Sequence, residues 1–176
     1  MTKYRAAAMT IAVAAALLGL WLTWQGYLLV LRSRIASFVG VPTAYVQPQH
    51  NGLLGMHTPG PYFNVTAPDG HHLATAFATL SGTVSGITFA VRPGGLIEPR
   101  EPDPLLTAEG TDRLARELIE RFWDNAPVSL QRVNYQKDKP GGVKASWRTS
   151  GPEVRVYTLI GMPGRFVAIE RGEPQP

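Results

Sequence analysis

The 176-residue chain contains no cysteine, and this absence excludes disulfides, thiol catalysis, zinc–thiolate sites and thioether-linked haem. Acidic residues are also missing from the first 68 positions, although the chain has 13 of them. Between Ile35 and Val91 the one formally charged residue is Asp69. The first half of the chain therefore offers very little charge with which to bind a charged ligand or substrate.

A local excess of positive charge is also lacking outside the amino-terminal region, although the formal net charge is +4 and the pI is about 9.6. Four of the 17 basic residues flank the first apolar run, and the other 13 balance the 13 acidic residues. Binding to a nucleic-acid backbone needs a clustered excess of Lys and Arg on the domain itself. We therefore expect no nucleic-acid partner.

Catalytic signatures are absent as well. Gly82-Thr83-Val84-Ser85-Gly86 lacks the serine placement of a nucleophile elbow. The glycine-rich turns do not match a phosphate-binding loop, because none is followed by a Lys-Ser or Lys-Thr pair at the start of a helix. Glu117 and Glu120 stand among arginines, which is typical of solvated ion pairs. The sequence thus predicts a protein that is not an enzyme and that binds no cofactor.

One long hydrophobic run is present, from Ala6 to Leu31, and it contains no formal charge. As a helix these residues would extend roughly 39 Å, more than the ~30 Å hydrocarbon core of a bilayer. A cleavable signal peptide has a shorter apolar region that ends in small residues, whereas this run ends in Tyr27-Leu28-Leu29-Val30-Leu31. We predict an uncleaved transmembrane anchor with a juxtamembrane stalk over residues 1–34, and lipid as a partner. Its predicted membrane-interface residues are Trp21, Trp24, Tyr27, Arg32 and Arg34.

Small side chains recur along one side of this run at steps of three and four residues: Ala12, Ala15, Gly19, Thr23 and Gly26. Small residues let membrane helices approach closely, so this strip is a candidate helix-packing face. Other transmembrane subunits, or a second copy of the chain, are the expected partners. The alternative is that Ala and Gly are simply common in membrane spans.

The positive-inside rule leans slightly towards a cytoplasmic amino terminus, because Lys3, Arg5 and the terminal amine precede the span while Arg32 and Arg34 follow it. No further basic block follows until Arg92. We therefore expect a single-pass protein of the cell membrane whose carboxy-terminal domain lies outside the cytoplasm, in a bacterial periplasm.

Residues 35–61 are rich in Gly and Pro but also contain apolar side chains, which predicts a linker packed on the domain, the lipid or a partner. All four histidines of the chain fall in and after this segment: His50, His57, His71 and His72, with Met56 among them. Imidazole and thioether groups bind copper and zinc, so these residues form a candidate metal site. No regular spacing places them on one face, and solvated loop histidines are the alternative.

An α+β domain is predicted over residues 62–171, followed by a tail over 172–176. Thr107 is a suitable N-cap for a helix that runs to Asn125 with an apolar stripe containing Leu114, Leu118 and Phe122. Four strands separated by short turns follow, at 128–136, 143–148, 154–160 and 165–171, and such connections give an antiparallel meander. The expected fold is one transmembrane helix and a helix packed on a four-stranded meander. The segment 73–80 is predicted as a strand or a short helix.

In element order alone, this arrangement resembles the periplasmic domains of type IV secretion and conjugation scaffolds and the ferredoxin-like domains of secretion and pilus assembly platforms. No motif of either group is in the sequence. The function expected first is that of a non-catalytic accessory, scaffold or assembly subunit of a membrane complex of secretion, conjugation, respiratory or photosynthetic type. The alternative is a membrane-anchored, extracytoplasmic ligand- or metal-binding sensory module.

Overall fold

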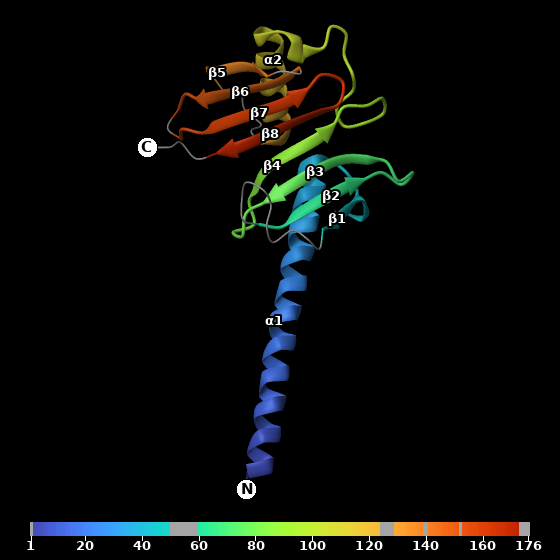
Figure 1. The fold of residues 1–176 in the computed structure, drawn as a ribbon, viewed down its shortest axis with the longest axis vertical. Coiled ribbons are helices and arrows are strands. Elements are labelled where there is room, and N and C mark those ends of the chain that lie inside the picture. The colour runs from blue at the N-terminus through green and yellow to red at the C-terminus, as the bar shows by residue number, and fades with distance from the viewer. Residues whose placement is uncertain (1, 50–59, 124–128, 139–140, 152, 173–176) are drawn as a thin grey trace.

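The computed structural model describes residues 2–49, 60–123, 129–138, 141–151 and 153–172. A 38-residue helix, α1 (Thr2–Val39), leads into the domain, which contains a second helix, α2 (Ala108–Phe122). Figure 1 shows the amino-terminal part of α1 extending below the domain, with its last turns and α2 behind the strands. Two short 3₁₀ helices, η1 (Thr43–Tyr45) and η2 (Pro104–Leu106), lie in the connections. The general α+β class with one long apolar amino-terminal helix is therefore confirmed.

Eight strands form a single antiparallel sheet, in which the strand order is β1-β2-β3-β4-β8-β7-β6-β5. Four strands belong to the first half of the chain: β1 (Val46–Pro48), β2 (Tyr62–Thr66), β3 (His72–Ala78) and β4 (Val84–Ala90). The others are β5 (Leu130–Asp138), β6 (Gly142–Thr149), β7 (Val156–Met162) and β8 (Phe166–Gly172). These last four form the predicted meander, but the prediction of a four-stranded sheet is wrong because the sheet has twice that number.

The sequence predicts β character at 62–66 and a strand at 87–91, which correspond to β2 and β4, but it does not predict that they join the meander in one sheet. The signal is weakest in β3. In β3 the side chains that face the core include Ala74, Ala76 and Ala78, whereas Thr75 and Phe77 lie on the other face. Alanine buries little apolar area, and threonine and phenylalanine do not mark a wet face, so the alternation of polarity typical of a strand is weak here. The ambiguous segment 73–80 is a strand over most of its length because it pairs with β2 and β4.

The sheet order divides the domain into two units with the same plan. The first unit is the end of α1 with β1–β4, and the second is α2 with β5–β8. The central neighbours β4 and β8 are antiparallel and place Ile87 opposite Ile169, both fully buried. Because the order reads the same from either edge, the two units are related by an approximate twofold axis that passes between β4 and β8.

The buried positions of the two units also recur at a nearly constant spacing. Leu31, Ile35 and Val39 of α1 are followed 83 positions later by Leu114, Leu118 and Phe122 of α2, and all six are buried. The same spacing relates Ala74 and Ala76 of β3 to Tyr157 and Leu159 of β7. The amino-terminal helix therefore supplies to the first unit the packing face that α2 supplies to the second.

The two helices meet over the middle of the sheet, where their carboxyl ends share an aromatic cluster. The ring of Phe38 lies 5.7 Å from that of Phe122 and 5.1 Å from that of Trp123, centroid to centroid. Phe89 of β4 adds a fourth ring, 5.0 Å from Phe122. One continuous core thus joins both units, and α1 belongs to it.

The α2 helix begins and ends close to where the sequence predicts. Thr107 is its N-cap, and the Thr107 hydroxyl accepts a hydrogen bond of 3.0 Å from the Gly110 amide. Residues 35–48, at the start of the predicted linker, form the end of α1, η1 and β1. Positions 50–59 and the tail 173–176 lie outside the described residues.

Candidate membrane anchor and membrane-proximal surface

The α1 helix is long and apolar enough to cross a membrane, with a mean hydropathy of 1.6 in its most apolar window, within Met9–Val39. The described side chains from Met9 to Thr23 are all exposed in this structure. The part of the helix before Trp24, residues 2–23, is roughly 33 Å long at ~1.5 Å per residue. That length matches the ~30 Å hydrocarbon core of a bilayer, within which exposed apolar side chains are at low free energy.

The other end of α1 is docked in the domain. Leu31, Ile35, Ala36 and Val39 are at most 2% exposed and belong to the common core. A helix that enters a packed core without a break cannot pivot at a flexible linker. The direction of α1 is therefore fixed with respect to the domain.

Three of the predicted membrane-interface residues hold the domain to the helix through backbone carbonyls. The Tyr27 hydroxyl lies 2.9 Å from Thr79 O and 3.1 Å from Leu80 O. The Arg32 side chain donates to Thr43 O at 3.0 Å, and Arg34 donates to Gly82 O at 3.4 Å. The structure thus places the β3–β4 turn, Thr79–Thr83, against the side of α1, a contact that no sequence pattern indicated.

The two tryptophans of the same predicted set lie lower on α1. Trp21 is 56% exposed, whereas Trp24 is half-buried and its ring lies 5.5 Å from that of Tyr27. An indole and a phenol at this level suit a headgroup boundary because each combines an apolar ring with a polar group. The aromatic pair therefore marks the level at which α1 begins to contact the domain.

The predicted helix-packing strip is fully accessible. Ala12, Ala15, Gly19, Thr23 and Gly26 are all exposed, and a Cβ atom placed on Gly19 or Gly26 would meet no atom within 4 Å. Thr23 directs its hydroxyl back to Gly19 O at 2.9 Å, so its polar group is satisfied within the helix. At 3.6 residues per turn, the strip and the docked residues Leu31, Ile35 and Val39 point roughly 160° apart. The strip therefore faces away from the side of α1 that holds the domain.

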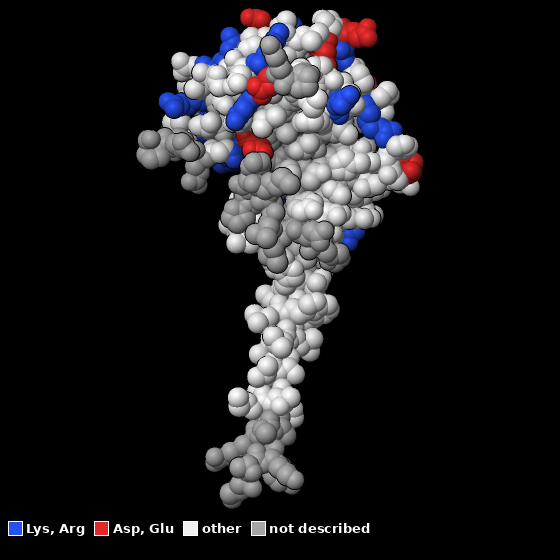
Figure 2. Space-filling view, viewed as in Figure 1, with Lys and Arg blue, Asp and Glu red and all other residues white. Residues whose placement is uncertain are grey.

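Charge is distributed unevenly between the units. On the face seen in Figure 2, blue and red side chains gather over the upper part of the domain, while the described helix and the lower part of the domain are almost entirely white. This agrees with the presence of a single charged residue between Ile35 and Val91. The unit closer to the candidate anchor can therefore approach lipid without burying many charges.

A polar cleft lies between the β3–β4 turn and the β6–β7 turn, with a volume of about 310 Å³. Hydroxyl groups line one side, and Glu153, Arg155 and Arg171 line the other. Glu153 contacts both guanidinium groups, directly at Arg155 and at 4.0 Å from Arg171. The cleft could accept a small polar or anionic group, although the Glu153 carboxylate already offsets part of the positive charge.

The four histidines of the candidate metal site are only partly described. His50 and His57 lie outside the described residues. His71 Nδ1 contacts Asp69 Oδ2 at 2.7 Å, while His72 Nε2 lies 3.2 Å from the Thr75 hydroxyl, so the adjacent rings have different partners. Burial lowers the pKa of His72, and hydrogen bonds from His71 lower that of Asp69. Within the part of the chain that the structure describes, no group of three His, Cys, Asp or Glu residues could hold a metal ion.

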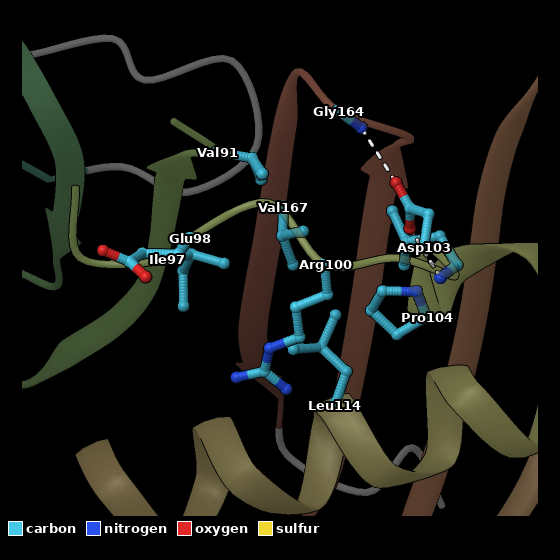
Figure 3. Close-up of a pocket in the computed structure, with 10 residues that line it drawn as sticks. Val91, Ile97, Glu98, Arg100, Asp103, Pro104, Leu114, Gly164 and Val167 are labelled. Atoms are coloured by element: carbon cyan, nitrogen blue, oxygen red, sulfur yellow. Dashed lines mark hydrogen bonds between the residues drawn. The ribbon is translucent and has the colours of Figure 1, made fainter. Parts of the chain in front are cut away.

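A second cavity lies in the second unit, between η2, α2 and β8, and is shown in Figure 3. Its volume of about 20 Å³ is enough for one water molecule. Asp103 closes one end: one carboxylate oxygen accepts from Leu105 N at 2.8 Å and the other from Gly164 N at 3.0 Å. This cavity is therefore a packing feature and not a ligand site.

Arg100, at the other end of the cavity, forms a bidentate pair with Glu117 of α2, with N–O distances of 2.7 and 2.6 Å. This hydrogen bonding lowers the pKa of Glu117 below its ordinary value of 4.5. Because the folded state then binds fewer protons than the unfolded state, the pair contributes to stability above pH 4.5, and the contribution is lost as the pH falls through the lowered pKa.

We expect Glu117→Gln to remove this part of the acid sensitivity. The measurement is the free energy of unfolding of wild type and variant from neutral pH to below pH 4. Both side chains are more than a third exposed, at 46% and 41%, so the difference should be below about 1 kcal/mol. Parallel pH profiles for the two proteins would contradict the stabilising role of the pair.

Comparisons with protein-family models, curated proteins and solved structures find no match for the chain.

Proposed function

We propose that this protein is a non-catalytic, single-pass membrane protein that acts as an accessory, scaffold or assembly subunit of a larger membrane complex. The observation that carries the proposal is the continuity of α1, whose apolar, exposed lower part leads without a break into the core of the domain. Such a geometry suits a part that must present a surface at a fixed position above a bilayer. It suits a flexibly tethered module less well.

The open strip on α1 supports assembly with other membrane helices. In lipid, helices associate through close packing and hydrogen bonds because lipid chains are as apolar as the side chains. Gly19 and Gly26 leave room for such an approach, and the domain docks on the opposite side of α1. A partner helix could therefore pack along the strip without displacing the domain.

Two adjacent alanines allow a matched test of this packing face. Ala15 belongs to the strip, whereas Ala14 points roughly 140° away from the mean direction of the strip and towards the docked side of α1. Ala15→Leu should weaken association with partner subunits or with a second copy, because a larger side chain prevents close helix approach. Ala14→Leu adds the same volume and should leave association unchanged.

The measurement is gentle detergent extraction of the native protein, followed by native mass determination and identification of the co-migrating chains. Co-migration of wild type and Ala14→Leu in a defined assembly, with loss of that assembly in Ala15→Leu, is the expected result. Equal assembly of all three proteins would overturn the role of the strip.

A monomer in every case would instead favour the second candidate, an extracytoplasmic ligand-binding module. The polar cleft lined by Arg155, Arg171 and the hydroxyls of the β3–β4 turn is the observation that favours it. In either case we propose that the amino terminus lies in the cytoplasm and the domain outside it. Cleavage of the domain by a protease added to intact cells tests this topology. This topology follows from Lys3 and Arg5 before the span, together with the lack of basic residues between Arg34 and Arg92.

A further inference from the structure

The β3–β4 turn is held against α1 by hydrogen bonds from α1 side chains to backbone carbonyls of the turn. Tyr27 bonds the carbonyls of Thr79 and Leu80, and Arg34 bonds the carbonyl of Gly82. Gly82 is buried with a positive φ of 87°, a conformation that favours glycine, and a Cβ atom there would lie 3.2 Å from the Arg34 guanidinium. These contacts fix the turn at the level of Tyr27 along the helix.

That level can be placed relative to a bilayer from the helix alone. Lys3 and Arg5 belong at the first headgroup layer, so the hydrocarbon region begins near Ala6. At ~1.5 Å per residue, a core of ~30 Å then ends near Gln25, and the next headgroup layer covers about 5–7 Å more. Tyr27 is two residues, or roughly 3 Å, past that boundary and therefore lies within the headgroup layer.

The surface of α1 supports this placement independently. Leu29 and Val30, just above Tyr27, are 62% and 51% exposed, so the apolar surface of the helix continues past the level of the turn. A boundary lower on the helix would leave both side chains in water. A boundary higher on the helix would place the turn still deeper in the bilayer.

The chemistry of the turn fits the same environment. Leu80, near its tip, is 61% exposed although it is a large apolar side chain, and no residue from Thr79 to Thr83 is charged. The neighbouring Arg34 supplies a guanidinium that suits lipid phosphates. Insertion of an exposed leucine between headgroups removes its apolar area from water, which lowers the free energy. An uncharged turn can enter this layer without burying a charge.

We propose that the β3–β4 turn is a lipid-contacting surface that inserts the Leu80 side chain into the headgroup region of the bilayer that α1 spans. The proposal rests on the membrane anchoring in the proposed function. Together with the span, this second contact would prevent the domain from tilting away from the membrane. The base of the first unit would then lie directly on the lipid.

The absence of cysteine makes a site-specific test direct. The full-length chain is reconstituted in vesicles of phosphatidylcholine and phosphatidylglycerol with one cysteine, introduced as Leu80→Cys, Leu106→Cys or Leu17→Cys. Each is labelled with the same nitrobenzoxadiazole fluorophore. Leu106 is the matched control, because it is also an exposed leucine, at 51%, but lies next to α2 in the second unit. Leu17 reports on the span.

Quenching by lipids spin-labelled near the headgroup is compared with quenching by iodide in water. We expect the label at position 80 to be quenched severalfold more by these lipids than the label at 106, and to be shielded from iodide. Lipids spin-labelled deep in the acyl chain should quench the label at 17. Folding is checked by the thermal unfolding temperature, which an exposed Leu80 should not alter.

The experiment distinguishes failure of the lipid-contact proposal from failure of the membrane-anchor proposal. If the label at 17 is quenched by lipid while the labels at 80 and 106 behave alike, Leu80 lies in water and the lipid-contact proposal is wrong. If the label at 17 is accessible to iodide and not to lipid, the anchor itself is wrong, and with it the proposed function.

Discussion

Replacement of Ile35 by alanine should destabilise the whole domain, although Ile35 lies on the helix that carries the membrane anchor. Its side chain is fully buried in the common core. Truncation of a buried isoleucine removes apolar contacts and leaves a cavity, and such changes cost about 2–5 kcal/mol of unfolding free energy. The expected result is a loss of that size for Ile35→Ala, measured by denaturant unfolding of the detergent-solubilised chain and monitored by tryptophan fluorescence.

Ser37→Ala is the matched control, because Ser37 lies half a turn away on α1 and is exposed. It should change the unfolding free energy by no more than about 0.5 kcal/mol. If Ile35→Ala has an equally small effect, the end of α1 is not part of the core in solution. The continuity that supports the scaffold proposal would then be lost.

The second large effect is expected at Asp112, which joins α2 to the meander. The indole nitrogen of Trp147 donates to one carboxylate oxygen at 2.8 Å, and Arg132 contacts the other at 2.9 Å. Trp147 is 1% exposed, so removal of the acceptor takes away the hydrogen-bond partner of a buried indole N–H. Asp112→Ala should cost about 1–3 kcal/mol, because a buried donor is left without a partner.

Two further variants separate the contributions of the indole and the arginine. Asp112→Asn keeps an oxygen that can accept from Trp147 and should be destabilised less than Asp112→Ala. Arg132→Ala removes the ion pair, whose side chains are 36% and 39% exposed, together with a cation–π contact to Tyr135 at 6.0 Å, and should cost less than about 1 kcal/mol. The measurement is urea unfolding of all three variants. A loss in Arg132→Ala equal to that in Asp112→Ala would contradict the dominant role of the indole contact.

Much of the second unit could be predicted because its local signals agree with one another. Thr107 offers a cap, the apolar stripe of α2 has helical spacing, and β6 alternates buried Val143, Ala145 and Trp147 with more polar neighbours. Helix formation and strand alternation both depend on near neighbours in the chain. For this reason α2 and the four-strand meander are found within a few residues of their predicted bounds.

The first unit could not be predicted in the same way. Its helix gives little amphipathic signal as a whole, because the turns that bury Leu31, Ile35 and Val39 directly follow a long apolar run that reads as a membrane span. Its strand β3 buries alanines, which give little signal. The sequence left 73–80 open between strand and helix, and pairing with β2 and β4 makes it a strand.

The candidate site also combines features that the sequence predicts with contacts that only the fold produces. The strip of small residues and the aromatic and basic residues near the end of the span were visible as patterns, because each depends on spacing along one helix. That Tyr27 and Arg34 bind the β3–β4 turn was not visible, since 52 and 48 positions separate the bonded residues. The histidines illustrate the opposite case, in which closeness in sequence did not bring His71 and His72 to a shared partner.

Four features follow from the amino-acid sequence alone: the long apolar helix, the neutrality of the remainder of the chain, the lack of thiol chemistry and the local elements of the second unit. These depend on composition and on short-range periodicity. The fold was needed to show that α1 is both the candidate anchor and a core helix, that eight strands form one sheet from two matching units, and that the turn carrying Leu80 is held against α1. Each of these depends on contacts between residues far apart in the chain, and local patterns carry no information about such contacts.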